Sequence, residues 1–305
     1  MNTRHAQLVL AVVREGSFTA AAKSLFVTQP TLSQQIRQIE QQLGQPIFER
    51  STTPVSLTPA GQIYVQSARR FLQIEAQMNE SLAALSGRQT GLLRLGLPMQ
   101  RADELLPQVL PEFQSAYPDV RLQAVSARND ALEAGLLGGE LDMALLFGEA
   151  ENEKLDYQLI ASDEVILVAG RKTALAQRVP SGSTVSLSAC EGEKFVLPAE
   201  NLPFARKYDE LLARAALSPF VALRTDDSQC AKRVCAACSL VMLCPFITLL
   251  SDTSAMQQLA HYRLSDAFYT PLYMVHPKDM PLTPYAQTLY TIMSNRFRAM
   301  TAYRL

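Results

Sequence analysis

The sequence predicts a multidomain chain of mixed α+β and α/β class, with an N-terminal helix-turn-helix, a long linker helix and a C-terminal two-lobed α/β region. Two amphipathic helical patterns separated by a short turn occupy residues 17–44. Residues 60–87 contain no proline and repeat apolar side chains in heptads. From residue 92 onward, short apolar strands alternate with amphipathic helices. A length of 305 residues with 48% hydrophobic side chains suggests two or three folded domains.

The first helix of the pair is expected over residues 17–25. Ser17 or Thr19 can accept from the free N–H groups at its start. The alanines at positions 20–22 favour a helix and are small enough for close helix–helix contact. Phe26 and Val27 follow at the turn, where we expect both to fill the core.

The second helix is expected to begin near Thr28, which is a suitable N-cap, with Pro30 in the first turn. Gly44 is the expected C-terminal stop. Four apolar side chains at spacings of 4, 3 and 4 residues predict one buried stripe, formed by Leu32, Ile36, Ile39 and Leu43.

The opposite face of this helix carries hydroxyls, amides and a guanidinium rather than Lys/Glu pairs. Its residues are Gln29, Thr31, Ser33, Gln34 and Arg37. Glutamine suits adenine, arginine suits guanine, and serine and threonine accept either base. The alternative is an ordinary solvated face. The helix-turn-helix pattern favours the first interpretation and predicts DNA as the partner.

The whole N-terminal segment resembles the LysR-type transcriptional regulators. The residues that carry the resemblance, in order and spacing, are Gly16, Ser17, Phe18, Ala21, Ala22, Leu25, Thr28, Gln29, Pro30, Leu32, Ser33, Ile36, Glu40, Leu43, Gly44, Phe48, Arg50, Leu57, Thr58, Ala60 and Gly61. The resemblance implies a winged helix-turn-helix whose DNA contacts are Gln29, Pro30, Thr31, Ser33, Gln34 and Arg37. It also implies a β-wing between Ile47 and Leu57.

The wing departs from the family's usual pattern. Relatives commonly carry further basic residues after the Phe-x-Arg segment, whereas residues 51–54 here read Ser-Thr-Thr-Pro. Arg50 is therefore the only cation expected at the wing tip. Because phosphate neutralisation sets the salt dependence of DNA binding, we expect a comparatively shallow salt slope.

Charge is distributed unevenly along the chain. Residues 1–90 carry eight Lys and Arg against five Asp and Glu, while the whole chain has a net charge of −1. The positive end coincides with the helix-turn-helix, as attraction to DNA requires. The sequence contains no run of about 18 apolar residues, so no membrane-spanning helix is predicted. The short run Leu8–Val13 does not resemble a secretory leader, so we expect a cytoplasmic protein with reduced cysteines.

The linker helix shows a heptad seam. Tyr64, Phe71, Met78 and Leu85 recur every seven residues, Ala68 and Leu82 fill the companion row, Val65 and Leu72 widen it, and Glu75 interrupts it. This pattern predicts pairing between two chains, which would present two recognition helices to two half-sites. The alternative is a long helix packed on its own domain. The resemblance implies paired linker helices, and hence a homodimer or a homotetramer.

The C-terminal region is expected to form two lobes joined by two crossings. Predicted strands are 92–97, 120–125, 143–147, 164–169, 195–197, 219–224, 240–243 and 268–276, and predicted helices are 103–117, 129–138 and 284–299. The resemblance implies an effector domain similar to periplasmic ligand-binding proteins. We expect domains at 1–58, 59–87 and 88–305, with lobe I at about 91–163 and 266–305 and lobe II at about 164–265.

A small ligand is expected beyond the carboxyl ends of the strands. The loops that meet this rule supply Pro98, Met99, Gln100, Arg101, Arg128, Asn129, Asn201, Pro203, Phe204 and Asp227. By resemblance, Gln100 and Asn129 take positions where relatives have small hydroxylated residues that bind effectors. Arg101 and Arg128 suggest an anionic effector. The alternative is that both arginines are solvated surface groups.

Four of the five cysteines lie close together in sequence, at Cys230, Cys235, Cys238 and Cys244. They suit either an oxidant or metal sensor or simple packing among apolar neighbours. No second Cys-x-x-Cys and no nearby histidine completes a metal site, so we expect packing and no metal.

No pattern typical of catalysis is present. The three histidines, His5, His261 and His276, adjoin no nucleophile motif, and no phosphate-binding glycine loop occurs. We therefore expect neither an enzyme nor a cofactor, but a sequence-specific regulator of transcription whose activity a small effector modulates. The alternatives are a cysteine-based redox or metal-responsive regulator, and a cytosolic solute-binding protein with a degenerate DNA-binding domain.

Overall fold

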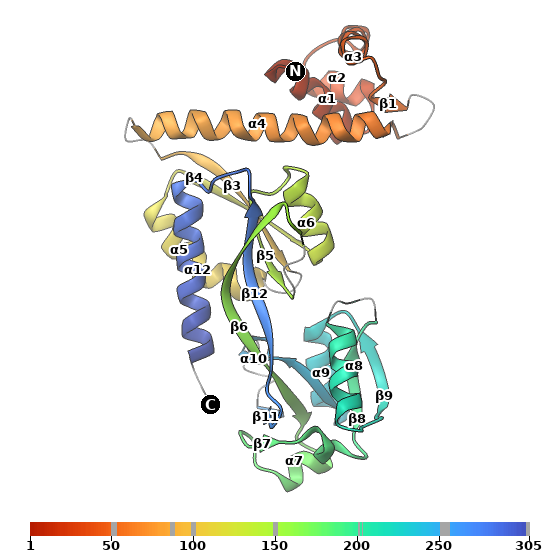
Figure 1. Cartoon of the computed structure of the whole chain (residues 1–305), viewed down its shortest axis with the longest axis vertical. Helices are drawn as coiled ribbons and strands as arrows, with labels where there is room; N and C mark the ends of the chain where they lie inside the picture. The colour runs from red at the N-terminus through yellow and green to blue at the C-terminus, as the bar shows by residue number, and fades with distance from the viewer. Residues whose placement is uncertain are drawn as a thin grey trace.

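The computed structural model describes residues 1–49, 54–85, 89–98, 102–148, 152–200, 202, 204–250 and 257–302. A small helical domain, one long helix and a two-lobed α/β body follow one another along the chain (Figure 1). None of the helices in these ranges is long and apolar enough to cross a membrane.

The N-terminal domain contains three helices and a minimal hairpin. They are α1 (Thr3–Glu15), α2 (Phe18–Ser24), α3 (Gln29–Leu43), β1 (Phe48–Glu49) and β2 (Ser56–Leu57). Ser17 Oγ accepts from the N–H of Ala20 at 3.5 Å and Thr28 Oγ1 from that of Thr31 at 3.3 Å, so both residues cap their helices. Gly44 ends α3 with a φ of 73°, a conformation that favours glycine.

The buried stripe of α3 is shorter than predicted. Leu32, Ile36 and Ile39 lie in the core of the N-terminal domain, but Leu43 is 43% exposed. Leu43 is the last residue of α3, one position before the Gly44 cap. The prediction was wrong for this residue because spacing alone does not show where the supporting helices end.

The expectation that Phe26 fills the core is also wrong. Its side chain is 97% exposed and its backbone is left-handed, with φ 55°. Leu25 and Val27 on either side do pack against the core. The N–H of Phe26 bonds to Lys23 O and that of Val27 to Ala22 O, so the turn closes tightly and directs this one side chain outward.

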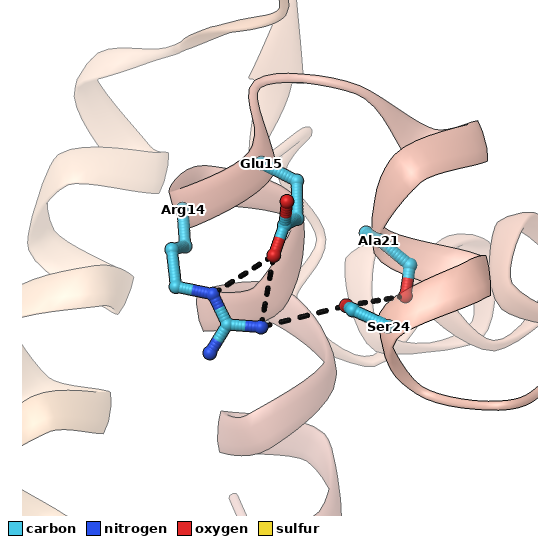
Figure 2. A network of polar contacts seen from close by, with 4 residues as sticks. All are labelled: Arg14, Glu15, Ala21 and Ser24. Carbon is cyan, nitrogen blue, oxygen red and sulfur yellow. Dashed lines mark hydrogen bonds and ion pairs between the residues drawn. The ribbon is translucent and has the colours of Figure 1, made fainter.

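A surface network joins the ends of α1 and α2 (Figure 2). Arg14 donates from Nε to Glu15 Oε1 at 2.9 Å and from Nη2 to Ser24 Oγ at 3.4 Å. Ser24 Oγ in turn donates to Ala21 O at 3.0 Å. Because the Arg14 side chain is largely exposed, the ion pair contributes only about 0–1 kcal/mol and serves mainly to orient the turn.

The linker helix α4 (Pro59–Leu85) is partly a member of the N-terminal domain. Tyr64, Val65 and Ala68 are buried in its core, where α4 lies against α1. These three residues were predicted to belong to an intermolecular seam, and for them the alternative of packing on the chain's own domain is correct. The heptad rule could not distinguish the two partners, because both require the same helical spacing.

The C-terminal body contains one ten-stranded sheet that runs through both lobes. Its strands are β3 (Gly91–Pro98), β4 (Val120–Ala127), β5 (Met143–Phe147), β6 (Leu155–Gly170), β7 (Thr184–Val185), β8 (Lys194–Pro198), β9 (Phe220–Thr225), β10 (Val241–Pro245), β11 (Leu259–Leu264) and β12 (Phe268–Pro277). The main order is β4-β3-β5-β12-β6-β10-β8-β9, with β11 paired to β6 and β7.

Short and long helices cover the sheet. They are α5 (Ala102–Ala116), α6 (Asn129–Leu137), α7 (Ala174–Arg178), the 3₁₀ turn η1 (Leu187–Cys190), α8 (Ala205–Arg214), α9 (Ser228–Cys238), α10 (Phe246–Leu250) and α12 (Pro284–Ala302). Figure 1 shows α5 and α12 beside the upper lobe and α8 and α9 beside the lower one.

Strands β6 and β12 are the two crossings between lobes. They pair antiparallel over Phe268–Pro277. Above them, β3 pairs parallel with β4 and β5, and below them β8 pairs parallel with β9 and β10. Each lobe has its own core, centred on residues such as Phe113 and Leu289 in lobe I and Phe195 and Tyr262 in lobe II.

The predicted fold class is confirmed, and most predicted elements are found within two residues of their expected bounds. Several elements were not predicted from the sequence: residues 155–163 of β6, the helices α7, α8 and α10, the turn η1, and the strands β7 and β11. The first half of β6 was missed because polar side chains such as Asp156 and Gln158 interrupt its apolar pattern.

We expect Gly61→Ala to destabilise the N-terminal domain much more than Gly44→Ala. A Cβ at Gly61 would lie 2.0 Å from Ile47 O, so α4 or the hairpin must shift. A Cβ at Gly44 meets nothing within 4 Å and costs only the left-handed conformation, about 1–2 kcal/mol. Thermal unfolding followed by circular dichroism measures both variants, and equal losses would contradict the close approach at Gly61.

Candidate nucleic-acid interface and ligand cleft

The first turns of α3 present a polar surface to solvent. Gln29, Pro30, Thr31, Gln34 and Arg37 are exposed and Ser33 is half-buried, while Leu32 and Ile36 face inward. In Figure 1, α3 lies on the side of the N-terminal domain away from α4. The first turn contains no acidic residue, so the positive end of the helix dipole is left for an anion such as phosphate.

Two contacts fix the geometry around this surface. The hydroxyls of Thr28 and Thr31 lie 2.8 Å apart, which orients the start of α3. Glu40 Oε1 accepts from the N–H groups of Ile47 and Phe48, at 2.9 and 3.3 Å. Through this carboxylate, α3 holds the base of the β1–β2 hairpin at a set position beside it.

The hairpin base occupies the position expected for the wing. Phe48 pairs with Leu57 and Glu49 with Ser56, in antiparallel register. Arg50, the predicted wing cation, lies outside the described residues together with residues 51–53.

The outer side of α4 carries an exposed apolar stripe. Its residues are Phe71, Ile74, Met78, Leu82 and Leu85, with Ile63 near the other end of the helix. They follow one another at helical spacings of three and four, so they share one face. An apolar stripe of this length on a solvent-facing helix marks an interaction surface.

Between the lobes lies a cavity of about 370 Å³. Lobe I contributes Pro98, Ala127, Arg128, Asn129, Asp130, Phe147 and Gly148 to its wall. Lobe II contributes Val196, Leu197, Pro198, Leu202, Phe204, Lys207, Tyr208, Thr225, Asp226, Ser228, Ala231, Met242, Leu243, Cys244, Pro245 and Thr248. The crossing strand β12 supplies residues 268–271. The volume and the mixed apolar and polar wall are typical of a small-molecule site.

The structure brings together four of the predicted ligand residues. Pro98, Arg128, Asn129 and Phe204 all line the cavity. The predicted residues Met99, Gln100, Arg101, Asn201 and Pro203 lie outside the described residues. Asp227 is not part of the wall, because its carboxylate turns back to cap α9.

Protein carboxylates already occupy the helix starts that face the cavity. Asp227 Oδ1 accepts from the N–H groups of Gln229 and Cys230, both at 2.9 Å. At α6, the N–H of Ala131 and the guanidinium of Arg128 lower the pKa of the exposed Asp130 carboxyl below its usual range. Arg128 Nε and Asp130 Oδ1 are 3.3 Å apart. The described wall thus contains two cationic side chains, Arg128 and Lys207, and two carboxylates, Asp130 and Asp226, so its charges balance.

Most of the aromatic part of the wall was not predicted from the sequence. Besides the predicted Phe204, it consists of Phe147, Tyr208, Phe268 and Tyr269. Phe147 ends β5, so the strand-end rule that selected the other loops could have found it. Tyr208 belongs to α8, where Ala205, Tyr208, Leu211 and Leu212 recur at helical spacing and are buried, so periodicity rather than the strand-end rule could have found it.

The cysteines divide into two groups. Cys190, Cys235 and Cys244 are buried, whereas Cys230 and Cys238 are exposed on α9. The expectation of packing is therefore wrong for Cys230 and Cys238, and Cys244 also lines the cleft. Within the described ranges, no group of three or more His, Cys, Asp or Glu side chains forms a metal site.

The chain belongs to the LysR family of bacterial transcriptional regulators. Residues 3–62 match the model of the bacterial regulatory helix-turn-helix protein, lysR family, and residues 86–298 match the LysR substrate binding domain. The predicted family, and a function combining a DNA-binding helix-turn-helix with an effector-binding domain, are confirmed.

Individual relatives and solved structures are consistent with this family. The uncharacterized regulator YcgK of Bacillus subtilis is 28% identical over 253 residues, 77% of each chain. Full-length CbnR, solved with its target DNA, has a TM-score of 0.66 at 22% identity and covers 97% of this chain and 99% of its own. A single-residue variant of full-length OxyR from Pseudomonas aeruginosa has a TM-score of 0.77 at 19% identity, covering 100% and 98%. At these identities the two structures show the shared fold.

We expect two thiols to react quickly with a disulfide reagent in the folded protein and three to react slowly. Cys230 and Cys238 are exposed, whereas burial raises the pKa of Cys190 to about 12 and raises that of Cys235 strongly. Thiol titration at pH 8 before and after denaturation measures both groups. Cys230→Ser should remove one fast thiol, and fast reaction of Cys235 would contradict the buried placement.

Proposed function

We propose that this protein reads duplex promoter DNA with α3 and changes its activity when a small effector binds between the lobes. The observation that carries the proposal is the first turn of α3, where a polar face is exposed on a helix anchored by buried Leu32 and Ile36. That CbnR, which shares this fold, was solved with its target DNA supports the same use of the helix here.

Each exposed side chain of α3 suits a role at the duplex. Gln29 and Gln34 suit adenine edges, Arg37 suits guanine or phosphate, and Ser33 and Thr31 suit either base or phosphate. Pro30 fixes the backbone of the first turn. Arg50 would add a phosphate contact from the wing, and its position beside Thr52 and Thr53 supports a weak phosphate grip.

We further propose that two or four copies assemble through the apolar stripe of α4. The inward face of the helix is used by its own domain, which leaves Phe71, Ile74, Met78, Leu82 and Leu85 for a second chain. A pair of such chains would carry two α3 helices and match two half-sites of an operator.

The effector proposed for the cleft is a small organic molecule with a large apolar part. Aromatic side chains and Met242 supply apolar contact area, and Asn129 and Lys207 supply polar groups. A carboxylate on the effector would compete with Asp130 for Arg128. The predicted residues of the neighbouring loops, Met99, Gln100, Arg101, Asn201 and Pro203, remain part of this proposal.

The proposed division of the chain is 1–58 for DNA binding, 59–87 for assembly and 88–305 for effector binding. The two family models support a division of this kind, with one ending at residue 62, inside α4, and the other beginning at residue 86. The relatives are transcriptional regulators, and we propose that this chain likewise acts without catalysis and in the cytoplasm, where its DNA lies.

Gln34→Ala should weaken binding to the preferred DNA by about 1–3 kcal/mol and relax the choice of base at one position. The DNA is a duplex enriched from a random pool by the wild-type protein, and affinity is measured by fluorescence anisotropy at fixed salt. Gln42→Ala is the matched control, because Gln42 is an exposed glutamine at the far end of α3.

Failure to enrich any duplex would refute the proposed function. An equal loss of affinity in both glutamine variants would instead contradict the role given to the first turns of α3.

Met78→Glu should dissociate the assembly. Met78 is exposed at the centre of the stripe, and pairing of two chains would bury a charge placed there. Gln62→Glu is the control, since Gln62 is exposed on the opposite side of α4. Sedimentation velocity of the two variants and the wild type distinguishes them. A wild-type monomer, or a Met78→Glu variant that keeps its mass, would argue against assembly through α4.

A further inference from the structure

We infer that α6 and β5 form a frame that mechanically couples the ligand cleft to the linker helix α4. The inference rests on the proposed function, because it assigns a regulatory route to the same cleft. Both elements begin or end at the cleft, and the loop that joins them lies against α4 (Figure 1).

At the cleft end, α6 and β5 are tied together. Arg128, Asn129 and Asp130 at the start of α6 line the cavity, as does Phe147 at the end of β5. The Asn129 side chain donates from Nδ2 to Phe147 O at 2.5 Å. A ligand that displaces either residue therefore moves the other.

At the opposite end, the loop after α6 lies directly on α4. Gln66 Nε2 donates to Leu137 O at 2.7 Å, and Arg69 Nη1 lies 2.6 Å from Glu140 Oε1. Gly139, with φ 70°, approaches so closely that a Cβ there would be 3.1 Å from Arg69 Cβ and 3.3 Å from Arg70 N. Gly139 thus allows a backbone-to-helix contact that is closer than a side chain at this position would permit without a shift of α4.

The start of β5 is held to α4 by a buried carboxyl. Asp142 directly precedes β5, and its side chain is only 14% exposed. It accepts hydrogen bonds from Gln73 Nε2 of α4 and from the N–H of Arg94, the latter at 2.7 Å. Burial raises the pKa of this carboxyl, although both hydrogen bonds and Arg94 act in the opposite direction.

A second set of contacts joins α4 to a part of lobe I that does not reach the cleft. Arg70 Nη1 lies 2.9 Å from Asp279 Oδ2, and Tyr285 donates to Glu80. These contacts form a fixed point after β12. With α4 held there, a shift of the α6–β5 frame would tilt the helix rather than translate it.

The other side of α4 is fixed to the DNA-reading domain. Tyr64, Val65 and Ala68 are buried against α1, and Thr3 Oγ1 donates to Glu75 Oε1 at 2.6 Å. A tilt of α4 therefore carries α3 with it. The complete route is cleft, α6–β5 frame, α4 and N-terminal domain.

The experiment uses the full chain and hydrogen exchange read by mass spectrometry, with and without the enriched duplex. Because coupling between two sites is reciprocal, DNA bound at α3 should change exchange in the first turn of α6 and at residues 146–148. We expect the exchange rate to change by about 5-fold or more, because about 5-fold is the lower end of the range of coupling factors between two sites.

The double variant Arg69→Ala/Gln73→Ala removes two of the three side-chain contacts described between the frame and α4, leaving that of Gln66, and touches neither the cleft nor α3. We expect it to keep its affinity for the duplex and to lose the change at the cleft. Glu112→Gln is the control, because it removes an ion pair of the same lobe, to Arg296 at 3.1 Å, away from α4. The control should behave as the wild type.

A second readout does not depend on DNA. In the absence of DNA, the amide hydrogens at the start of α6 should exchange faster in the double variant than in the wild type. The melting temperature of the lobes should be unchanged. Equal exchange there would overturn the coupling, as would a double variant that keeps the DNA-induced change. If no duplex were enriched, the proposed function would be refuted. The second readout would then still test whether the α6–β5 frame is coupled to α4.

Discussion

The packing of α4 against α1 is the constraint on which the rest of the molecule depends. A domain of fewer than 60 residues buries a smaller fraction of its surface than a larger domain does and is marginally stable alone. Tyr64, Val65 and Ala68 enlarge its core, and full burial of a side chain the size of valine is favourable by about 1.5–3 kcal/mol. Because the N-terminal part of this apolar face is buried internally, the apolar residues further along α4 are left for a partner and the polar face for lobe I. One helix therefore sets the orientation of α3, of the apolar stripe and of the α6–β5 frame.

Local features of the sequence were sufficient to predict the recognition helix, because caps and periodicity depend on neighbours in the chain. Thr28 and Gly44 act as predicted, and Leu32 and Ile36 are buried. Phe26 could not be predicted, since its exposure follows from the sign of φ at a single turn residue. The inner row of α4 was also ambiguous, because the same heptad spacing serves a domain core and a paired helix.

The cleft was predicted in outline and missed in detail. Strand ends identify Pro98, Arg128 and Asn129 because parallel strands bring their carboxyl ends together. An acidic residue before a helix has two uses, however, and only the hydrogen bonds from Gln229 and Cys230 show that Asp227 serves as a cap. Charge compensation by Asp130 also depends on side-chain geometry that spacing does not encode.

The two interfaces of α4 differ in kind, and this difference decides which of them can move. Its contact with α1 is apolar and interdigitated, so any displacement would open voids that close packing disfavours. At the α6–β5 loop, its contact with lobe I includes the ion pair Arg69–Glu140, whose carboxylate is more than half exposed. Exposed pairs contribute only about 0–1 kcal/mol each, because water replaces them readily. The Gln73–Asp142 contact is more buried, but it is a hydrogen bond rather than a set of packed side chains. We therefore expect the N-terminal domain and α4 to move as one body, on which lobe I acts through the polar contacts of the α6–β5 loop.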